Sequence, residues 1–174
     1  MWQEMRIIIS DSSCLIDLHK GGILQEIFAL PFSFAIPQPL FEEELLSISV
    51  EEKAALVASG MEVIVLPGDQ VVTAVTYFNS NRRLKLNDCF ALVLAETTEA
   101  AILFTADQPL RQLAESKDIE THGVLWAIDM LEEHTDIDPC LLLNALELYD
   151  GDSLVRLPED EVKSRMRRLR RRVS

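Results

Sequence analysis

Short apolar runs, rich in β-branched or aromatic residues, alternate with longer helical patterns along this chain. Four of these runs are predicted to be strands, and a fifth, shorter run is a candidate edge strand. The runs are Arg6–Ser10, Phe32–Ile36, Glu62–Leu66, Ala101–Thr105 and Ile119–Thr121. Strands that alternate with helices in this way predict a parallel sheet covered by helices on both faces.

Glycine and proline mark the ends of the helical patterns between these strands. The strongest pattern begins at Leu86 and is apolar over much of its girth, so this helix is predicted to be buried. The expected helices are Cys14–Lys20, Ile23–Leu30, Pro39–Ile48, Ser49–Ser59, Asp69–Arg83, the one that begins at Leu86, Gln108–Lys117, Gly123–Glu133, Pro139–Tyr149 and Glu159–Arg172.

A chain of 174 residues suits a single hydrophobic core, and a core of this size needs no disulfide or metal to fold. The three cysteines, Cys14, Cys89 and Cys140, are widely spaced and odd in number, which is typical of buried thiols in a reducing compartment. The first residues lack the features of a signal peptide, and no apolar stretch is long enough to span a bilayer. We therefore expect a cytoplasmic protein that does not bind membranes.

The net charge of −13 hides a strong asymmetry between the body and the C-terminus. Seven of the 16 basic residues lie in the segment Val162–Ser174, which contains no acidic residue, so all 29 acidic residues lie in the remainder. An acidic body repels nucleic acid at long range, whereas a basic tail attracts it. The total charge therefore argues against a nucleic-acid ligand, and its distribution leaves that ligand open.

Two predicted strands end in an aspartate at the same edge of the sheet, Asp11 after the first and Asp107 after the fourth. Sites in open parallel sheets form beyond the carboxyl ends of the strands. Asp88 stands at the start of the buried helix, and Glu43 lies one turn into the helix after Pro37. Carboxylates gathered at one edge repel each other unless a cation neutralises them, and hard divalent ions prefer oxygen ligands. The pattern predicts a divalent-metal site.

A structural role competes with metal binding at each of these positions. An aspartate before a helix, such as Asp11, Asp88 or Asp107, is more often an N-cap than a ligand. A glutamate in the run Glu42–Glu44 is usually part of a solvated helix face. Because Asp11 opens a helix, nearby backbone N–H groups are expected to keep it ionised.

Four segments, taken together and in order, resemble the PIN domain family. They read IIISDSSCLIDL, IPQPLFEEELL, LKLNDCFALVLAE and ILFTADQPLRQLAE, and they lie between residues 6 and 134. The chain looks like the subgroup that includes the VapC-like toxins of toxin–antitoxin modules and their uncharacterised relatives. The resemblance implies a three-layer α/β/α fold with a central parallel sheet and an extra C-terminal helical extension. Residues 1–150 would form the PIN-like nuclease domain and residues 151–174 a basic helical appendage.

The resemblance also implies which side chains carry the chemistry. The family's acidic residues map onto Asp11, Glu43, Asp88 and Asp107. The three aspartates would bind Mg²⁺ or Mn²⁺ directly, and Glu43 would act as a ligand or through a bound water. Glu44 stays open as the alternative to Glu43, because it directly precedes Leu45 as the family's glutamate often precedes a leucine.

Two further residues match positions that support the acids in the family. Ser13 is the small polar residue that commonly supports the first aspartate. Arg111 follows Asp107 by one helical turn, as the basic residue of the family's last motif often does; a structural salt bridge is an equal alternative for it.

The implied activity is metal-dependent hydrolysis of RNA phosphodiester bonds by an endoribonuclease that is the toxin of a toxin–antitoxin module. The implied partners are an RNA substrate, a protein antitoxin and a second copy of the chain, for which the apolar segment Ile23–Leu30 offers a surface. The alternative is a PIN-fold interaction or regulatory module with little or no catalysis. The intact set of acids favours the enzyme.

The arginine-rich C-terminus has three possible roles. It can lie as a helix on its own acidic body, which is the preferred prediction. It can also guide RNA toward the acidic cleft, since phosphate contacts come mostly from arginine and lysine. The third role is docking of a partner such as an antitoxin.

Overall fold

The structure, a computed structural model, describes residues 5–174. Five strands form one sheet in the order β3-β2-β1-β4-β5, and every neighbouring pair is parallel. The strands are β1 (Ile7–Ser10), β2 (Ser33–Pro37), β3 (Met61–Ile64), β4 (Ala101–Phe104) and β5 (Glu120–His122). Helices flank this sheet, so the predicted three-layer α/β/α fold with a central parallel sheet is confirmed.

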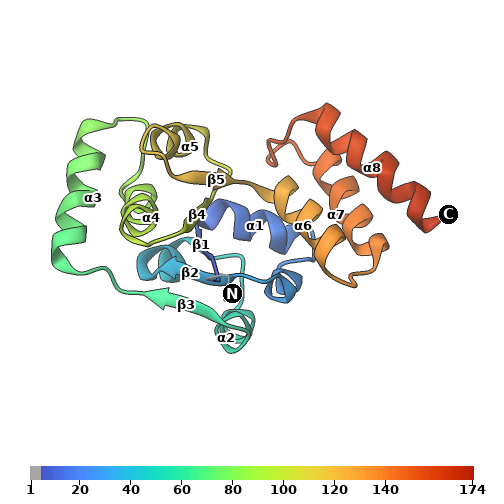
Figure 1. The fold of residues 1–174 in the computed structure, drawn as a ribbon, viewed down its shortest axis with the longest axis horizontal. Coiled ribbons are helices and arrows are strands. Elements are labelled where there is room, and N and C mark those ends of the chain that lie inside the picture. The colour runs from blue at the N-terminus through green and yellow to red at the C-terminus, as the bar shows by residue number, and fades with distance from the viewer. Residues whose placement is uncertain (1–4) are drawn as a thin grey trace.

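Helices cover both faces of the sheet, as Figure 1 shows. On one face α4 (Leu86–Thr97) packs against β1, β2 and β4, and α3 (Gly68–Ser80) packs on the outside of α4. On the other face α1 (Ser12–Lys20) packs with α6 (Val124–His134). The remaining helices are α2 (Val50–Ala58), α5 (Gln108–Glu115), α7 (Pro139–Gly151) and α8 (Glu159–Val173).

The central strand β1 fixes the position of the candidate site. It is paired on both sides, with β2 and with β4, and its Ile8 and Ile9 are buried in the core. Its last residue, Ser10, pairs with Phe104 of β4. The next residue of each chain segment, Asp11 and Thr105, therefore leaves the carboxyl edge of the sheet side by side.

The predicted helix Pro39–Ile48 is wrong in length and type. The helical stretch covers only residues 38–44, and Leu40–Glu44 within it form a single π-helical turn, η2. Leu40 and Leu45 are both fully buried although they are five residues apart, a spacing that an α-helix places on different faces. A π turn brings positions five apart back into line, so burial of both leucines favours it.

The predicted helix Ile23–Leu30 is also shorter in the structure. The prediction that it offers an apolar surface to a second copy of the chain is wrong. It contains a 3₁₀ helix, η1, over Gln25–Ala29. Its apolar residues Ile23, Ile27 and Leu30 are 0–4% exposed, because they join the core rather than the surface. This segment therefore does not offer the apolar face that a second copy would need.

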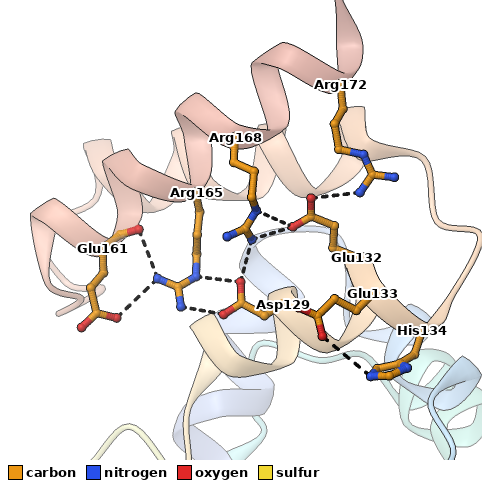
Figure 2. Close-up of polar contacts among 8 residues, drawn as sticks. All are labelled: Asp129, Glu132, Glu133, His134, Glu161, Arg165, Arg168 and Arg172. Carbon is orange, nitrogen blue, oxygen red and sulfur yellow. Dashed lines mark hydrogen bonds and ion pairs between the residues drawn. The ribbon is translucent and has the colours of Figure 1, made fainter.

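The C-terminal helix α8 lies against α7 and buries Val162, Met166 and Leu169. Its arginines face acids of α6, as Figure 2 shows: Arg165 pairs with Asp129 at 2.6 Å, and Arg168 and Arg172 both pair with Glu132. The tail thus lies on the acidic surface of its own chain, the preferred of its three predicted roles. The division of the chain at residue 150 stays a prediction.

Candidate metal centre

Asp11 is the most buried of the predicted acids, with 2% of its surface exposed. It caps α1, because its carboxylate accepts a 2.8 Å hydrogen bond from the Ser12 backbone N–H. Burial raises the pKa of Asp11, and the nearby Glu44 charge raises it further, although hydrogen bonds from Thr105, Ser13 and Ser12 oppose both effects. The backbone hydrogen bond at the start of α1 therefore does not keep the pKa of Asp11 low, contrary to the expectation from sequence.

Two hydroxyl groups hold the second carboxylate oxygen of Asp11. The Ser13 and Thr105 hydroxyls each donate to Oδ2 at 2.8 Å. The same hydroxyls accept hydrogen bonds from backbone N–H groups after β4, Ser13 Oγ from Ala106 and Thr105 Oγ1 from Asp107. This network ties the ends of β1 and β4 together and fixes the orientation of the Asp11 carboxylate.

This geometry matches the predicted supporting role of Ser13. The sequence motifs did not single out Thr105, which makes the same kind of contact to Asp11. Thr105 is fully buried, and nothing in the sequence distinguishes it from the other residues of the apolar run AILFT except its hydroxyl at the strand's end. That polar end was the only available signal.

The glutamate that reaches the site is Glu44, not Glu43. Glu44 accepts a hydrogen bond from the Ser12 hydroxyl and another, at 2.9 Å, from the Asn87 side chain. Glu43 is exposed, and no hydrogen bond or ion pair joins it to another side chain of residues 5–174. The π turn accounts for the position of Glu44, the alternative left open by the sequence, because this turn holds more residues than a turn of the α-helix expected after Pro37.

Asp88 lies at the first turn of α4, where its Oδ2 accepts a 2.7 Å hydrogen bond from the Lys85 N–H. Burial raises the pKa of Asp88 to about 6. The hydrogen bond opposes this shift, and the charges of Asp11, Asp107 and Glu44 add to it. Hydrogen bonds place these acids at the same edge, because Glu44 accepts from Ser12 and from Asn87, and Thr105 bonds both the Asp11 carboxylate and the Asp107 N–H.

Asp107 follows β4 and caps α5, where its Oδ1 accepts a 2.8 Å hydrogen bond from the Leu110 N–H. It is partly exposed, and it borders a surface groove. The capping role that competed with metal binding is therefore real. It does not exclude the other role, because the hydrogen bond occupies only one of the two carboxylate oxygens.

Arg111 lies one turn after Asp107, and it makes no ion pair with any residue of the described chain. Its guanidinium donates a 3.0 Å hydrogen bond to the Thr105 carbonyl, and its Nε is buried without a partner. Gly123 leaves room for it, since a Cβ there would lie 3.0 Å from the guanidinium. Arg111 thus braces the end of β4, and the alternative of a salt bridge is wrong.

The chemistry of this donor set fits a hard divalent cation. Asp11, Glu44, Asp88 and Asp107 supply only carboxylate oxygens, and none of them pairs with a lysine, arginine or histidine within residues 5–174. Their spacing is wider than a closed site, because no three acidic, histidine or cysteine side chains in the described part of the chain are grouped to hold a metal ion. Binding would require adjustment of the side chains that are now caps.

An all-parallel sheet between helices, with carboxylates beyond its central strands, defines an α/β protein with a candidate site at the carboxyl edge of the sheet. A family model described as a PIN domain matches residues 7–169. The chain therefore belongs to the PIN domain family, whose members are typically nucleases. A search of the curated proteins gave no match. Across residues 5–174, no helix is long and apolar enough to cross a membrane.

Proposed function

We propose that this PIN domain is a metal-dependent endoribonuclease. The observation that supports this proposal best is the group of four carboxylates, Asp11, Glu44, Asp88 and Asp107, which shares the carboxyl edge of the sheet without a cationic side chain to balance it. Uncompensated charge in a partly buried site is costly, and a bound divalent ion would relieve it. The nuclease fold makes a nucleic-acid phosphodiester the matching substrate.

In this proposal Asp11, Asp88 and Asp107 hold Mg²⁺ or Mn²⁺, and Glu44 takes the place first assigned to Glu43. A divalent ion held by these residues would supply activation of a water and stabilisation of charge on the phosphodiester transition state. No covalent intermediate with the protein is needed.

The surrounding residues orient these ligands. Ser12, Ser13 and Thr105 together donate three hydrogen bonds to Asp11, so its oxygens have fixed directions. Ser12 and Asn87 hold Glu44 in the same way. Because these hydrogen bonds already orient the carboxylates, less free energy is needed to order the site when the substrate binds.

Calorimetric titration of Mn²⁺ into the purified protein tests the metal site. We expect saturable binding to the wild type and its loss in the Asp11→Asn/Asp107→Asn variant. The matched control is Asp69→Asn/Asp160→Asn, which changes two exposed acids at the starts of α3 and α8 and should leave binding intact. Absence of binding to the wild type at millimolar metal would contradict the proposal and favour a non-catalytic interaction module.

The same proteins test hydrolysis. With Mg²⁺ or Mn²⁺ the wild type and the control should cut the interior of a labelled single-stranded RNA, and chelation or the Asp11→Asn/Asp107→Asn change should abolish cutting. Cutting that persists in the chelator would exclude the metal-dependent mechanism.

The role as a VapC-like toxin with a protein antitoxin is part of this proposal and rests on the resemblance of the sequence motifs. Induced expression of the wild type should arrest growth of the host, and Asp88→Asn should relieve the arrest without lowering the amount of protein. The homodimer also stays a proposal, and light scattering of the purified protein would test it.

A further inference from the structure

A groove of about 500 Å³ leads away from the acidic edge. Its lining includes Ser13, which bonds Asp11, and Asp107, so the groove adjoins the candidate metal centre. The groove is also lined by Lys20 at the end of α1 and by Leu154 and Arg156 from the segment that links α7 to α8. The C-terminal extension thus contributes to the lining of a groove beside the site.

The linking segment is held in place, so its position in the groove is defined. Val155 is buried in the core. Asp152 closes a turn, because its side chain accepts a 2.9 Å hydrogen bond from the Leu154 N–H and its carbonyl accepts one from the Val155 N–H. Asp152 also pairs with Lys20 at 3.5 Å, which connects the segment to α1.

The charges in the groove differ from those of the surrounding body. Arg156 is exposed and forms no ion pair with any residue of the described chain, although acids outnumber bases over most of this protein. Asp17 also lines the groove and opposes the positive charge, and Asp152 neutralises part of Lys20. Arg156 is therefore the one cation here whose charge is not already met by a carboxylate of its own chain.

We propose that this groove holds the single-stranded RNA beside the scissile bond, with Arg156 as its main phosphate contact and Lys20 as a second. Arginine binds phosphate through two parallel N–H donors and stays charged at any physiological pH. Leu154, 79% exposed at the rim, offers an apolar surface to a base. This inference rests on the proposed ribonuclease function, since it assigns a binding path to the substrate of that same site.

The salt dependence of RNA binding tests the contact. The probe is a fluorescein-labelled single-stranded oligoribonucleotide of mixed sequence, followed by anisotropy in EDTA and again with Ca²⁺. Each lost phosphate contact lowers the slope of log affinity against log salt by about 0.7 for a single strand. We expect that loss in Arg156→Gln, roughly twice that loss in Lys20→Gln/Arg156→Gln, and an unchanged slope in Arg156→Lys, which keeps the charge.

Arg171→Gln is the matched control, because Arg171 is also exposed, forms no ion pair in residues 5–174 and lies near the C-terminal end of α8, away from the linking segment. Its slope should equal that of the wild type. An Arg156→Gln slope equal to that of the wild type would overturn the groove and leave an acidic peptide as its better occupant.

The outcomes separate this inference from the function on which it rests. If the wild type cleaves RNA with metal and Arg156→Gln keeps the wild-type salt slope, the assignment of the groove to RNA is wrong but the nuclease function stands. If Arg156→Gln has a reduced salt slope but the wild type fails to cleave RNA with any metal, the result supports RNA binding in the groove and contradicts the nuclease function. Absence of RNA binding in both buffers overturns both.

Discussion

Two clusters of acids lie in different parts of this molecule and are neutralised in opposite ways. At the carboxyl edge, Asp11, Glu44, Asp88 and Asp107 have no basic partner within residues 5–174, and burial with mutual repulsion raises the pKa of Asp88 to about 6. On α6, Asp129 and Glu132 meet the arginines of α8 (Figure 2). Burial is the largest single influence on Glu132, yet the bonds from Arg168 and Arg172 together lower its pKa.

The difference shows which cluster is structural. Where a carboxylate is buried and paired, its charge joins two helices, and nothing further is needed to satisfy it. Where carboxylates gather unpaired, the fold bears an electrostatic cost that a ligand can remove. The candidate site is therefore the cluster without arginines, even though the arginine-rich region is the more conspicuous feature of the sequence.

The largest expected effect separates function from stability at Asp88. Asp88→Asn should lower metal-dependent RNA hydrolysis by roughly a hundredfold, equivalent to about 3 kcal/mol of transition-state stabilisation. Its free energy of unfolding should stay equal or rise by up to about 1 kcal/mol, because the amide oxygen can still accept from the Lys85 N–H while the repulsion disappears. Kinetic assays and urea unfolding measure the two quantities. A variant that lost activity only in proportion to stability would assign Asp88 to the fold.

A second change tests the register set by the π turn. Glu44→Gln should lower hydrolysis by about tenfold, because the amide removes a negative charge from the edge. Glu43→Gln, one position away and exposed, should leave the rate within a factor of about two of the wild type. Rates measured at saturating Mg²⁺ or Mn²⁺ make the comparison. A larger effect at Glu43 would return the role to the residue first predicted.

At the paired cluster, the expected effect is on stability alone. Glu132→Gln removes the carboxylate that pairs with Arg172 and leaves Arg168 with Asp129 as its remaining anion. It should lower the free energy of unfolding by about 1–2 kcal/mol, or roughly 4 °C in Tm. Glu133→Gln is the control, because that side chain is 68% exposed and its one ion pair within residues 5–174 is with His134, at 3.8 Å. Its effect should stay within about 0.5 kcal/mol. Equal effects in the two variants would show that the α6–α8 pairs contribute nothing.

The smallest effect is a pH dependence of opposite sign in the two clusters. The pKa of Asp88 is raised to about 6 in the folded state, so ionisation of this side chain destabilises the fold fully above that pH. The cost disappears as the pH falls toward 3.8, the ordinary pKa of the group. The lowered pKa of Glu132 instead supplies stability above 4.5 that is lost in more acidic solution. Between pH 7 and pH 5 the stability advantage of Asp88→Asn over the wild type should therefore shrink, by roughly 1 kcal/mol at most. Urea unfolding at both values measures it, and a constant difference would contradict the raised pKa.

The sequence predicts the order of strands and helices. It also predicts three of the four acids that the structure brings to the edge of the candidate site. Apolar runs of strand length, separated by helical patterns, allow few arrangements other than a parallel sheet between helices. Acids placed directly after the first and fourth strands must then lie at one edge, because β1 and β4 are neighbours with their carboxyl ends aligned. Asp88 at the start of the buried helix and Ser13 beside Asp11 followed from the same pattern and from the family motifs.

Tertiary packing decided the rest. Burial of both Leu40 and Leu45 requires the π turn that brings in Glu44, and no local propensity distinguishes that turn from an α-helix. Thr105 bonds the carboxylate of Asp11, which lies almost a hundred residues earlier in the sequence, and Arg111 bonds the Thr105 carbonyl. Neither contact follows from the sequence around these residues. The arginines of the tail find α6 only when α8 packs on α7. The sequence by itself determined which charges the chain carries and in what order, whereas the three-dimensional packing determined which of them meet a partner, because residues distant in sequence interact only when the core brings them together.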